Sequence, residues 1–189
     1  MIYASRYKSQ IGNILLASDE EGLTGLWFEG QKYFANTLPD ERILQETEIL
    51  REAKKWLDVY FTGEEPPFTP PLHPTGSTFR QAVWQLLLQI PYGQTITYGE
   101  IARRMAEVKK VPRMSAQAVG GAVGHNEISI IIPCHRVVGT NGSLTGYGGG
   151  IDKKISLLEL EHADMRRLFL PQKGTAGEMV SFITGNENG

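Results

Sequence analysis

The chain has 189 residues, a formal net charge of −2 at pH 7 and a single cysteine. That length allows one large domain or two small ones, and one cysteine excludes an internal disulfide and a cysteine-rich zinc site. The N-terminus has no basic, apolar and small-residue pattern, and no apolar run approaches about twenty residues. We therefore expect a soluble intracellular protein with no membrane partner, in a compartment that keeps the thiol reduced.

The N-terminal part of the sequence predicts a sheet followed by a helix. Short strand-like runs at residues 2–7, 12–17 and 23–28 are separated by turn-forming residues, which indicates an antiparallel meander. Apolar residues then recur at helical spacing from about Gln45 to Phe61. No cluster of reactive side chains stands out, so we interpret this part as scaffold.

A proline-rich stretch from Glu64 to Thr75 forbids helix and favours an extended chain. We place the domain boundary there, which gives an N-terminal scaffold domain at residues 1–75 and a second domain at 76–189. The second domain begins with a predicted helix at about Ser77 to Gln89, which Ser77 or Thr78 caps.

Two short helices follow in the second domain. Thr97 and Glu100 have the spacing of a capping box, so we expect a helix from Thr97 to about Met105, with Glu100 reaching back to its start. Ser115 can cap another helix, at about Ala116 to Val123. The pair resembles a helix-turn-helix, although many such pairs are only structural.

The second of these helices is poor in long side chains. Glycine costs helix stability, so something must require the small size. One interpretation is tight packing on a neighbouring helix, and the other is close approach to a nucleic-acid backbone in the minor groove.

The charged residues are unevenly distributed along the sequence. There are five basic and two acidic residues between Tyr98 and Ala118, whereas there are four basic and eight acidic residues between Asp40 and Glu65. Each segment is either a solvated charged face or part of an asymmetric distribution that gives the protein a basic face.

The C-terminal third predicts turns, a loop and a last helix. Asn141-Gly142 is a hairpin signal, and residues 146–150 form a glycine loop around Tyr147. Asp152 is expected to cap a helix that carries Glu161. The chain then has a docking segment at residues 168–171 and a polar end.

The cysteine lies in the stretch that organises the domain. The β-branched run from Ile128 to Ile132 predicts a buried strand, and Pro133 should end it. Cys134 would then lie at the exit of the strand, with His135 beside it. A lone cysteine is often only a small buried hydrophobe, but a nearby histidine can take the thiol proton and leave a nucleophilic thiolate.

Pro-Cys-His-Arg-Val at 133–137 resembles the active-site signature of the O6-alkylguanine-DNA alkyltransferase family, bacterial type. The resemblance continues through residues 97–100, 118–121, 126, 145–147, 149–150 and 161, and it is dense over about 77–161. It implies an α+β fold. A small ribonuclease-H-like domain of antiparallel sheet and helix would precede a mostly helical domain with a winged helix-turn-helix-like DNA-binding motif.

The resemblance also implies a single-turnover DNA repair reaction. Cys134 would take a methyl or other alkyl group irreversibly from the O6 position of guanine, or the O4 position of thymine, in a flipped nucleotide. His135 would accept the thiol proton through a water, and Glu161 would orient the imidazole. Tyr98 would protonate the guanine and help to rotate the nucleotide, and Asn126 would join the DNA-binding helix to the active-site strand. Arg136 is assigned a structural role that ties the two domains together.

The implied partner is double-stranded DNA with O6-alkylguanine, bound through the minor groove by a monomer in the cytoplasm or on the nucleoid. We expect no cofactor and no metal, because the zinc ligands of some family members are absent. The implied DNA contacts are Tyr98, Ser115, Ala116, Gln117, Ala118, Gly120 and Arg103, and the implied substrate pocket is Pro133, Val137, Tyr147, Gly148 and Gly149.

Three positions depart from the family pattern. Gln117 stands where an arginine finger is usual, Glu127 replaces a proline, and His162 replaces a glycine. Two alternatives remain for the function. A cysteine hydrolase would also use Cys134 and His135, and a non-catalytic lesion-binding protein of the alkyltransferase-like type would share the fold without the transfer.

Overall fold

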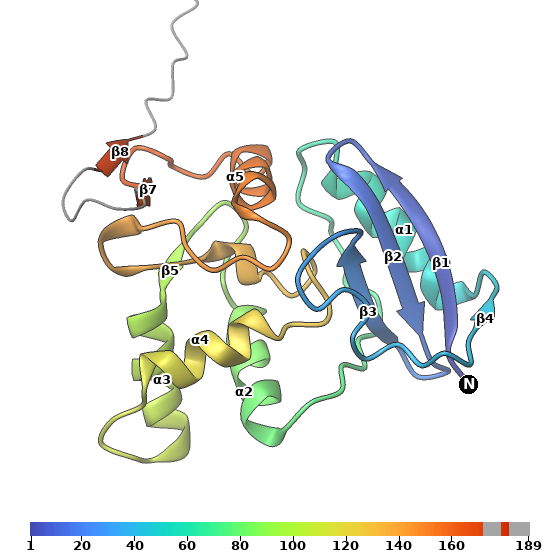
Figure 1. Ribbon diagram of the computed structural model, residues 1–189, viewed down its shortest axis with the longest axis horizontal. Coiled ribbons are helices and arrows are strands. Elements are labelled where there is room, and N and C mark those ends of the chain that lie inside the picture. The colour runs from blue at the N-terminus through green and yellow to red at the C-terminus, as the bar shows by residue number, and fades with distance from the viewer. Residues whose placement is uncertain (172–178, 182–189) are drawn as a thin grey trace, which may run out of the picture.

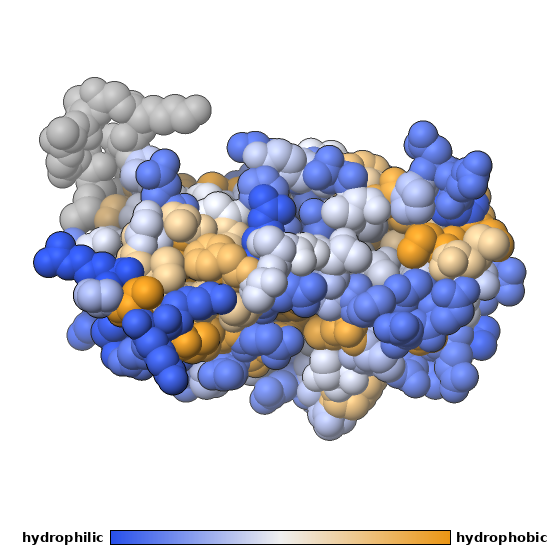
Figure 2. Space-filling view, turned by 90° about the horizontal axis from the view of Figure 1, so that it is seen from below, coloured by the Kyte–Doolittle hydropathy of each residue, from blue (hydrophilic) through white to orange (hydrophobic). Residues whose placement is uncertain are grey.

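The computed structural model describes residues 1–171 and 179–181. Figure 1 shows two halves, with a β-sheet and helix α1 on one side and helices α2 to α5 on the other. Within the described ranges no helix has the length and apolar character needed to span a membrane. The face seen in Figure 2 is mostly hydrophilic, and its hydrophobic residues lie in small separate groups.

The N-terminal half is a four-stranded sheet with the order β3-β2-β1-β4. Strands β1 (Tyr3–Ser9), β2 (Gly12–Ser18) and β3 (Leu23–Phe28) form the predicted antiparallel meander, and the short β4 (Ile43–Leu44), which was not predicted, runs parallel to β1. All of β3 and most of β2 are buried, because α1 covers one face of the sheet and residues Ala35 and Leu38 pack on the other.

Helix α1 (Glu48–Tyr60) starts three residues later than predicted. Thr47 is its N-cap, and the Thr47 side chain accepts a hydrogen bond from the Leu50 amide. The cap satisfies an amide that has no partner within the helix and therefore fixes the start of α1 at this point. Leu50, Ala53, Trp56, Leu57 and Tyr60 form its buried stripe.

The proline-rich segment is extended, as predicted, and lies along β3. Leu23 donates its amide to the Pro71 carbonyl at 2.7 Å, and His73 donates to the Leu23 carbonyl at 2.8 Å. Farther along the same strand, Leu26 bridges to Ile128 in the C-terminal half. One edge of the sheet therefore contacts both the linker and the segment that leads to Cys134.

Three helices of the C-terminal half begin at the predicted caps. Helices α2 (Thr78–Leu87), α3 (Tyr98–Lys109) and α4 (Ala116–Gly124) are capped by side chains that accept a backbone amide three residues later, namely those of Ser77, Thr97 and Ser115. Helix α3 runs four residues beyond the predicted end and stops at Lys110, which has a left-handed φ of 55°. Glu100 does not reach back to Thr97, because its carboxylate bonds Arg103 and Arg104 instead.

Short strands and turns hold the last part of the chain. Strand β5 (Ile96–Thr97) pairs in parallel with β6 (Val137–Val138), which brings the start of α3 beside the cysteine segment. The predicted hairpin turn is the 3-10 turn η2 (Thr140–Gly142), not a hairpin between strands. The predicted Asp152 cap is wrong, because α5 (Ile151–Leu160) has Gly150 at its N-cap and Asp152 already lies in its first turn.

The docking segment after α5 packs on the C-terminal half. Leu168 is buried with Val138, Leu144 and Leu158, and strand β7 (Phe169–Pro171) pairs with β8 (Met179–Ser181). The predicted polar end of the chain lies among residues 182–189, outside the described residues.

Candidate active site and pocket

The segment before Cys134 is a tight turn, so the predicted strand at Ile128–Ile132 is wrong. Only Ile128 forms a β-bridge, and Ile130 has a positive φ of 68°. The Asn126 side chain organises the turn: its Oδ1 accepts from the Ile128 amide at 3.0 Å, and its Nδ2 donates to the Ile132 carbonyl at 2.8 Å. Because only His125 separates Asn126 from the end of α4, Asn126 joins that helix to the cysteine segment.

Cys134 opens the 3-10 turn η1 (Cys134–Arg136) and is buried. Burial raises the pKa of the thiol above its usual value, although the Asn126 hydrogen bond and the charge of Lys154 lower it. Without a base the sulfur is therefore a protonated thiol near neutral pH, which is a poor nucleophile.

His135 is fully buried beside Glu161. Its Nε2 lies 2.7 Å from Glu161 Oε1, and a carboxylate only accepts hydrogen bonds, so Nε2 carries the proton. The other ring nitrogen, Nδ1, is buried and has no partner in the structure. Burial lowers the pKa of His135, with a further decrease from Arg136 and Lys154, and Glu161 opposes the shift. The result is a neutral imidazole with a free basic nitrogen.

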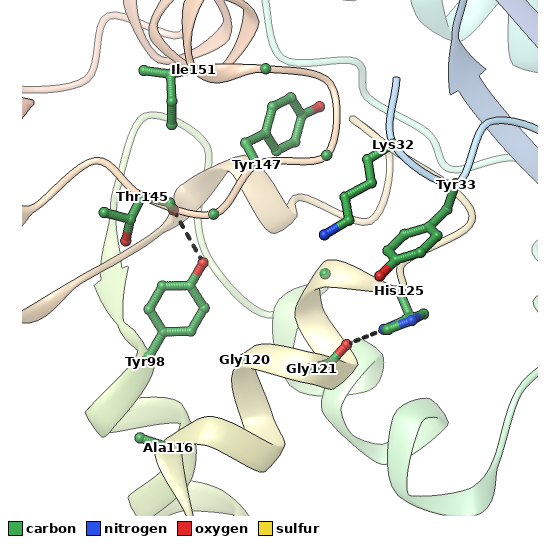
Figure 3. A pocket seen from close by; sticks show the side chains of 14 residues that line it. Lys32, Tyr33, Tyr98, Ala116, Gly120, Gly121, His125, Thr145, Tyr147 and Ile151 are labelled. Atoms are coloured by element: carbon green, nitrogen blue, oxygen red, sulfur yellow. Dashed lines mark hydrogen bonds between the residues drawn. The ribbon is translucent and has the colours of Figure 1, made fainter. Parts of the chain in front are cut away.

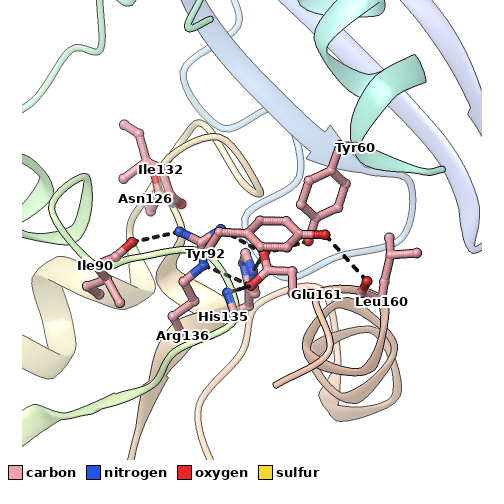
Figure 4. A network of polar contacts seen from close by, with 10 residues as sticks. Tyr60, Ile90, Tyr92, Asn126, Ile132, His135, Arg136, Leu160 and Glu161 are labelled. Carbon is pink, nitrogen blue, oxygen red and sulfur yellow. Dashed lines mark hydrogen bonds and ion pairs between the residues drawn. The ribbon is translucent and has the colours of Figure 1, made fainter. Parts of the chain in front are cut away.

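Glu161 is the centre of a buried polar cluster (Figure 4). Arg136 donates to both of its oxygens, at 2.9 and 2.8 Å, and the Tyr60 hydroxyl donates to Oε1 at 2.8 Å. Burial alone would raise the pKa of Glu161, but His135 and Arg136 favour the charged form and hold the pKa at about 2. Glu161 is therefore ionised at neutral pH, as the orientation of His135 requires.

Arg136 has the structural role that the sequence suggested, but it does not tie the two halves together directly. Besides Glu161, its guanidinium donates to the Ile90 carbonyl at 2.8 Å and lies over the Tyr92 ring. These partners all belong to the C-terminal half. The link to the N-terminal half is the Tyr60 hydroxyl on Glu161.

Two buried polar residues of this region were missed. Tyr60 belongs to the helical stripe that was interpreted as scaffold, and nothing in that pattern separates it from the other apolar positions. Lys154 is fully buried and donates to the carbonyls of Val137 and Thr145. Burial lowers its pKa to about 8. Its place on the inner side of α5, among Leu157 and Leu158, was the only available signal.

A pocket of about 670 Å³ opens between α4, the loop at 145–151 and the residues Lys32 and Tyr33 of the N-terminal half (Figure 3). The Tyr98 hydroxyl donates to the Thr145 carbonyl at 3.4 Å, and burial together with the charge of Cys134 raises the pKa of Tyr98 to about 12. The Tyr147 hydroxyl is buried without a hydrogen bond in the structure. Cys134 and Tyr147 belong to the same hydrophobic core, and Tyr98 packs against that core, so the cysteine lies behind the pocket wall.

The predicted site residues divide into those that line this pocket and those that do not. Tyr98, Ala116, Gly120, Tyr147 and Gly148 line it, together with Gly121, Gly124 and His125. Cys134, Pro133, Val137 and Gly149 are not among the lining residues. Cys134 and Val137 belong instead to the large hydrophobic core that packs against Tyr98.

The glycines of α4 decide between the two explanations for its small residues. A Cβ atom placed on Gly120, Gly121 or Gly124 would meet nothing within 4 Å. Tight packing on a neighbouring helix is therefore wrong for these three positions, which face open space. Ser115, Ala116, Gln117 and Ala118 are also exposed, at the start of the same helix.

Arg103 is less available than the sequence suggested. Its guanidinium bonds Glu100 at 2.7 and 2.9 Å and Glu107 at 2.6 Å. We call this set of side chains, with Arg104, the α3 charge cluster. A contact between Arg103 and DNA would have to compete with these carboxylates.

The two other departures from the family pattern have visible structural roles. Glu127 is buried, and its carboxylate accepts from the Trp27 indole at 2.8 Å, which adds a polar link between β3 and the cysteine segment. Burial raises the pKa of Glu127. His162 has a φ of 60°, a conformation that favours glycine, and this explains why a glycine is usual there.

Within the described ranges, no three His, Cys, Asp or Glu residues lie close enough together to form a metal site.

Most of the chain is similar to known proteins. Residues 2–74 match the ribonuclease-like domain of 6-O-methylguanine DNA methyltransferase, and residues 78–163 match its DNA-binding domain. A methylated-DNA–protein-cysteine methyltransferase of Methanosarcina acetivorans is 47% identical over 161 residues, which covers 85% of this chain and 98% of the relative. One from Haemophilus influenzae is 44% identical and covers 85% and 86%.

A solved structure gives the same result for the fold. The crystal structure of Mycobacterium tuberculosis OGT in complex with DNA superposes with a TM-score of 0.73 at 42% identity, and the match covers 85% of this chain and 92% of that one. A sheet domain joined to a helical DNA-binding domain, with a thiol behind the open face of a helix, defines a class of DNA-binding protein that reacts through cysteine. The chain belongs to the 6-O-methylguanine DNA methyltransferase family. Its function is DNA repair by transfer of an alkyl group from DNA to a cysteine of the protein.

Proposed function

We propose that Cys134 is the acceptor and that its substrate is O6-alkylguanine in double-stranded DNA. The observation that carries this proposal is the ordered sequence of groups from Arg136 and Tyr60 through Glu161 to His135, which ends in an unpartnered basic nitrogen. Cys134 is the only thiol of the chain and adjoins that histidine. A buried thiol with a raised pKa reacts only if such a base removes its proton.

The proton balance of the reaction follows from these groups. His135 Nδ1 takes the thiol proton through a water, and Glu161 stabilises the imidazolium. The sulfur attacks the alkyl carbon, the bond between that carbon and O6 breaks, and a thioether forms. Tyr98, which its raised pKa keeps protonated, gives a proton to the departing guanine and recovers one from His135. The thioether has no leaving tendency, so each molecule reacts once.

DNA would approach the open face of α4 through the minor groove. A base inside a duplex cannot reach a buried sulfur, so the nucleotide must be flipped out, at a cost of a few kcal/mol. The exposed start of α4 and its glycines support this geometry, because side chains do not obstruct the approach of a backbone. Gln117 would replace the flipped base in the stack, and Ser115, Ala116, Ala118 and Gly120 would contact the strand.

We place the boundary between the scaffold domain and the reactive domain at residues 75 and 76, at the end of the extended linker. We also expect the protein to act as a monomer. Pro133, Val137 and Gly149 would support the pocket from behind, and a cytoplasmic location would give access to DNA in the nucleoid.

The test uses Cys134→Ser and intact mass. After incubation with a duplex that contains O6-methylguanine, the unsubstituted protein should gain the mass of one methyl group in exchange for one hydrogen, and Cys134→Ser should gain none while it still binds the duplex. A mass gain in the Cys134→Ser protein would assign the acceptor to another residue. DNA binding without any mass gain in the unsubstituted protein would instead indicate a lesion-binding protein that does not transfer.

A further inference from the structure

The side of the pocket that α4 forms has few positively charged side chains. Helix α4 has no charged residue between Ala116 and Gly124, and Arg103 and Arg104 of α3 are bonded to carboxylates. Among the described residues that line the pocket, Lys32 is the only Lys or Arg. A surface that binds a phosphate backbone needs cations to displace counterions, so the position of Lys32 calls for an explanation.

Lys32 is supplied by the other half of the molecule. It lies in the segment after β3, and its backbone amide donates to the Gly148 carbonyl on the pocket loop at 3.0 Å. Behind it, the Gln31 side chain accepts from the Phe28 amide at 2.8 Å and fixes the segment to the end of the strand. Tyr33 then stacks on His125 at the end of α4, with ring centroids 4.6 Å apart and planes inclined by 22°.

These contacts make residues 31–33 a bridge across one end of the pocket, which we call the arm. Figure 3 shows the Lys32 side chain pointing into the pocket, toward α4, with the Tyr33 ring beside it. The Lys32 ammonium lies 5.1 Å from the centre of the Tyr33 ring. Across residues 1–171 and 179–181, Lys32 forms no ion pair with a carboxylate. Its charge is therefore available to an anion.

We propose that the arm is a second DNA contact, made by the N-terminal half, in which Lys32 neutralises a phosphate beside the flipped nucleotide. Tyr33 is a positioning residue that holds Lys32 in place through its stack on His125. The inference rests on the proposed entry of the nucleotide into this pocket. Recognition would then be divided: α4 supplies a shape that the groove can approach, and the arm adds a charge at the pocket itself, besides the exposed Lys109, Lys110 and Arg113 before α4.

The experiment measures the second-order rate constant of methyl transfer from duplex DNA, which includes the binding step, against salt concentration. Lys32→Gln should make the slope of log rate against log salt shallower by about 0.9, the value for one phosphate contact. Between about 50 and 200 mM salt, the advantage of the unsubstituted protein should therefore shrink about 3.5-fold. The rate with free O6-benzylguanine, which has no phosphate, should not change.

Matched variants separate the arm from general charge effects. Lys153 also lies over an aromatic ring, that of Phe28 at 5.5 Å, but it does not line the pocket, so Lys153→Gln should keep the full slope. Tyr33→Phe should retain the stack and the slope, and Tyr33→Ala should lose part of it. Phe34 has the same exposed fraction as Tyr33, 40%, and Phe34→Ala should behave like the unsubstituted protein.

The outcomes distinguish the two proposals. An unchanged salt slope in Lys32→Gln, or an equal loss in Lys153→Gln, would overturn the role of the arm while leaving Cys134 as acceptor. A loss of the free-base reaction in Lys32→Gln would also overturn it, because Lys32 would then shape the pocket. Absence of any transfer in the unsubstituted protein would refute the proposed function instead.

Discussion

Two carboxylates of the C-terminal half have pKa values of about 2, in opposite settings. Glu161 and its partners His135 and Arg136 are buried, with side chains at most 10% exposed. In the α3 charge cluster, Glu100 is 33% exposed and Arg103 is 58% exposed. Hydrogen bonds donated by the Arg103 side chain are the main cause of the lowered pKa of Glu100. A similar pKa therefore describes two different kinds of interaction.

The difference is what happens when one partner is removed. In the α3 charge cluster water and salt replace a lost partner, so exposed pairs of this kind contribute little. In the Glu161 cluster the Arg136 side chain is only 10% exposed, so water compensates for a lost partner far less, and an uncompensated buried ion is costly. The buried pair also fixes the protonated nitrogen of His135, whereas the exposed pair orients no group of the active site. Because Glu161 is buried, its charge can orient His135, which the exposed charge of Glu100 does not do for any group of the active site.

Glu161→Gln removes the central charge of the buried cluster and should have the largest effect of these variants. The neutral amide leaves Arg136 buried without a counter-ion, so the free energy of unfolding at pH 7 should fall by about 3–5 kcal/mol. Methyl transfer should slow as well, because nothing stabilises the imidazolium form of His135. Denaturant unfolding and single-turnover rates under native conditions measure the two effects.

Glu100→Gln is the matched control for that change. Its unfolding midpoint should stay close to that of the unsubstituted protein, and any difference should vanish when salt is added. The pH dependence sharpens the test. The folded pKa of Glu161 lies below its unfolded value of about 4.3, so its stabilisation is present above that value and is lost as pH falls toward about 2. Equal losses of stability in the two variants would contradict the distinction between the clusters.

His135→Ala tests the chemical use of the buried cluster. Loss of a general base should slow transfer at pH 7 by about 100-fold. In the unsubstituted protein, the rate should fall as pH decreases through the pKa of His135, which burial places below about 6.5, because the protonated ring cannot accept the thiol proton. In His135→Ala, the rate should instead keep rising with pH toward the raised pKa of Cys134.

A single-turnover rate profile over pH measures this change. His73→Ala is the control, because His73 is paired with Asp19 at a distance from the pocket and its loss should leave the profile unchanged. A profile of His135→Ala with the same shape as that of the unsubstituted protein would remove His135 from the proton path.

The sequence predicted those features that depend on neighbouring residues. The caps at Ser77, Thr97 and Ser115 were correct, because each needs only the amide three residues later. The strand at Ile128–Ile132 was wrong for the opposite reason. Its β-branched residues favour a strand, but the Asn126 side chain and the bridge to Leu26 impose a turn. The bridge joins residues that are distant in the sequence, and the Asn126 hydrogen bonds override the local preference for a strand.

The same limit applies to the active site. Cys134 and His135 are adjacent and could be identified from the sequence, whereas Glu161 was assigned only through the resemblance to a family. Tyr60 lies 101 residues from Glu161, and the bond between them depends on how the two halves pack. Lys32 reaches its pocket through a contact with Gly148 that no local pattern encodes. Periodicity and capping rules describe elements, and these residues depend on the arrangement of elements.

The prediction with the smallest expected effect concerns Gln117, an uncharged residue of α4. It is exposed in the first turn of α4, whose open face supports the approach of DNA. If its side chain replaces the flipped base, Gln117→Ala should slow transfer from duplex DNA by about tenfold, equivalent to about 1.4 kcal/mol, and leave the reaction with free O6-benzylguanine unchanged. Gln117→Arg should tighten duplex binding most at low salt, with a slope steeper by about 0.9.

Rates for both variants on both substrates, beside a binding titration at several salt concentrations, measure these effects. Gln85→Ala, at an exposed glutamine of α2, is the control for loss of a surface amide and should change neither reaction. The free base needs no extrusion, so it isolates the pocket from the flipping step. If Gln117→Ala slows the free-base reaction as much as the duplex reaction, Gln117 shapes the pocket and does not hold the flipped state.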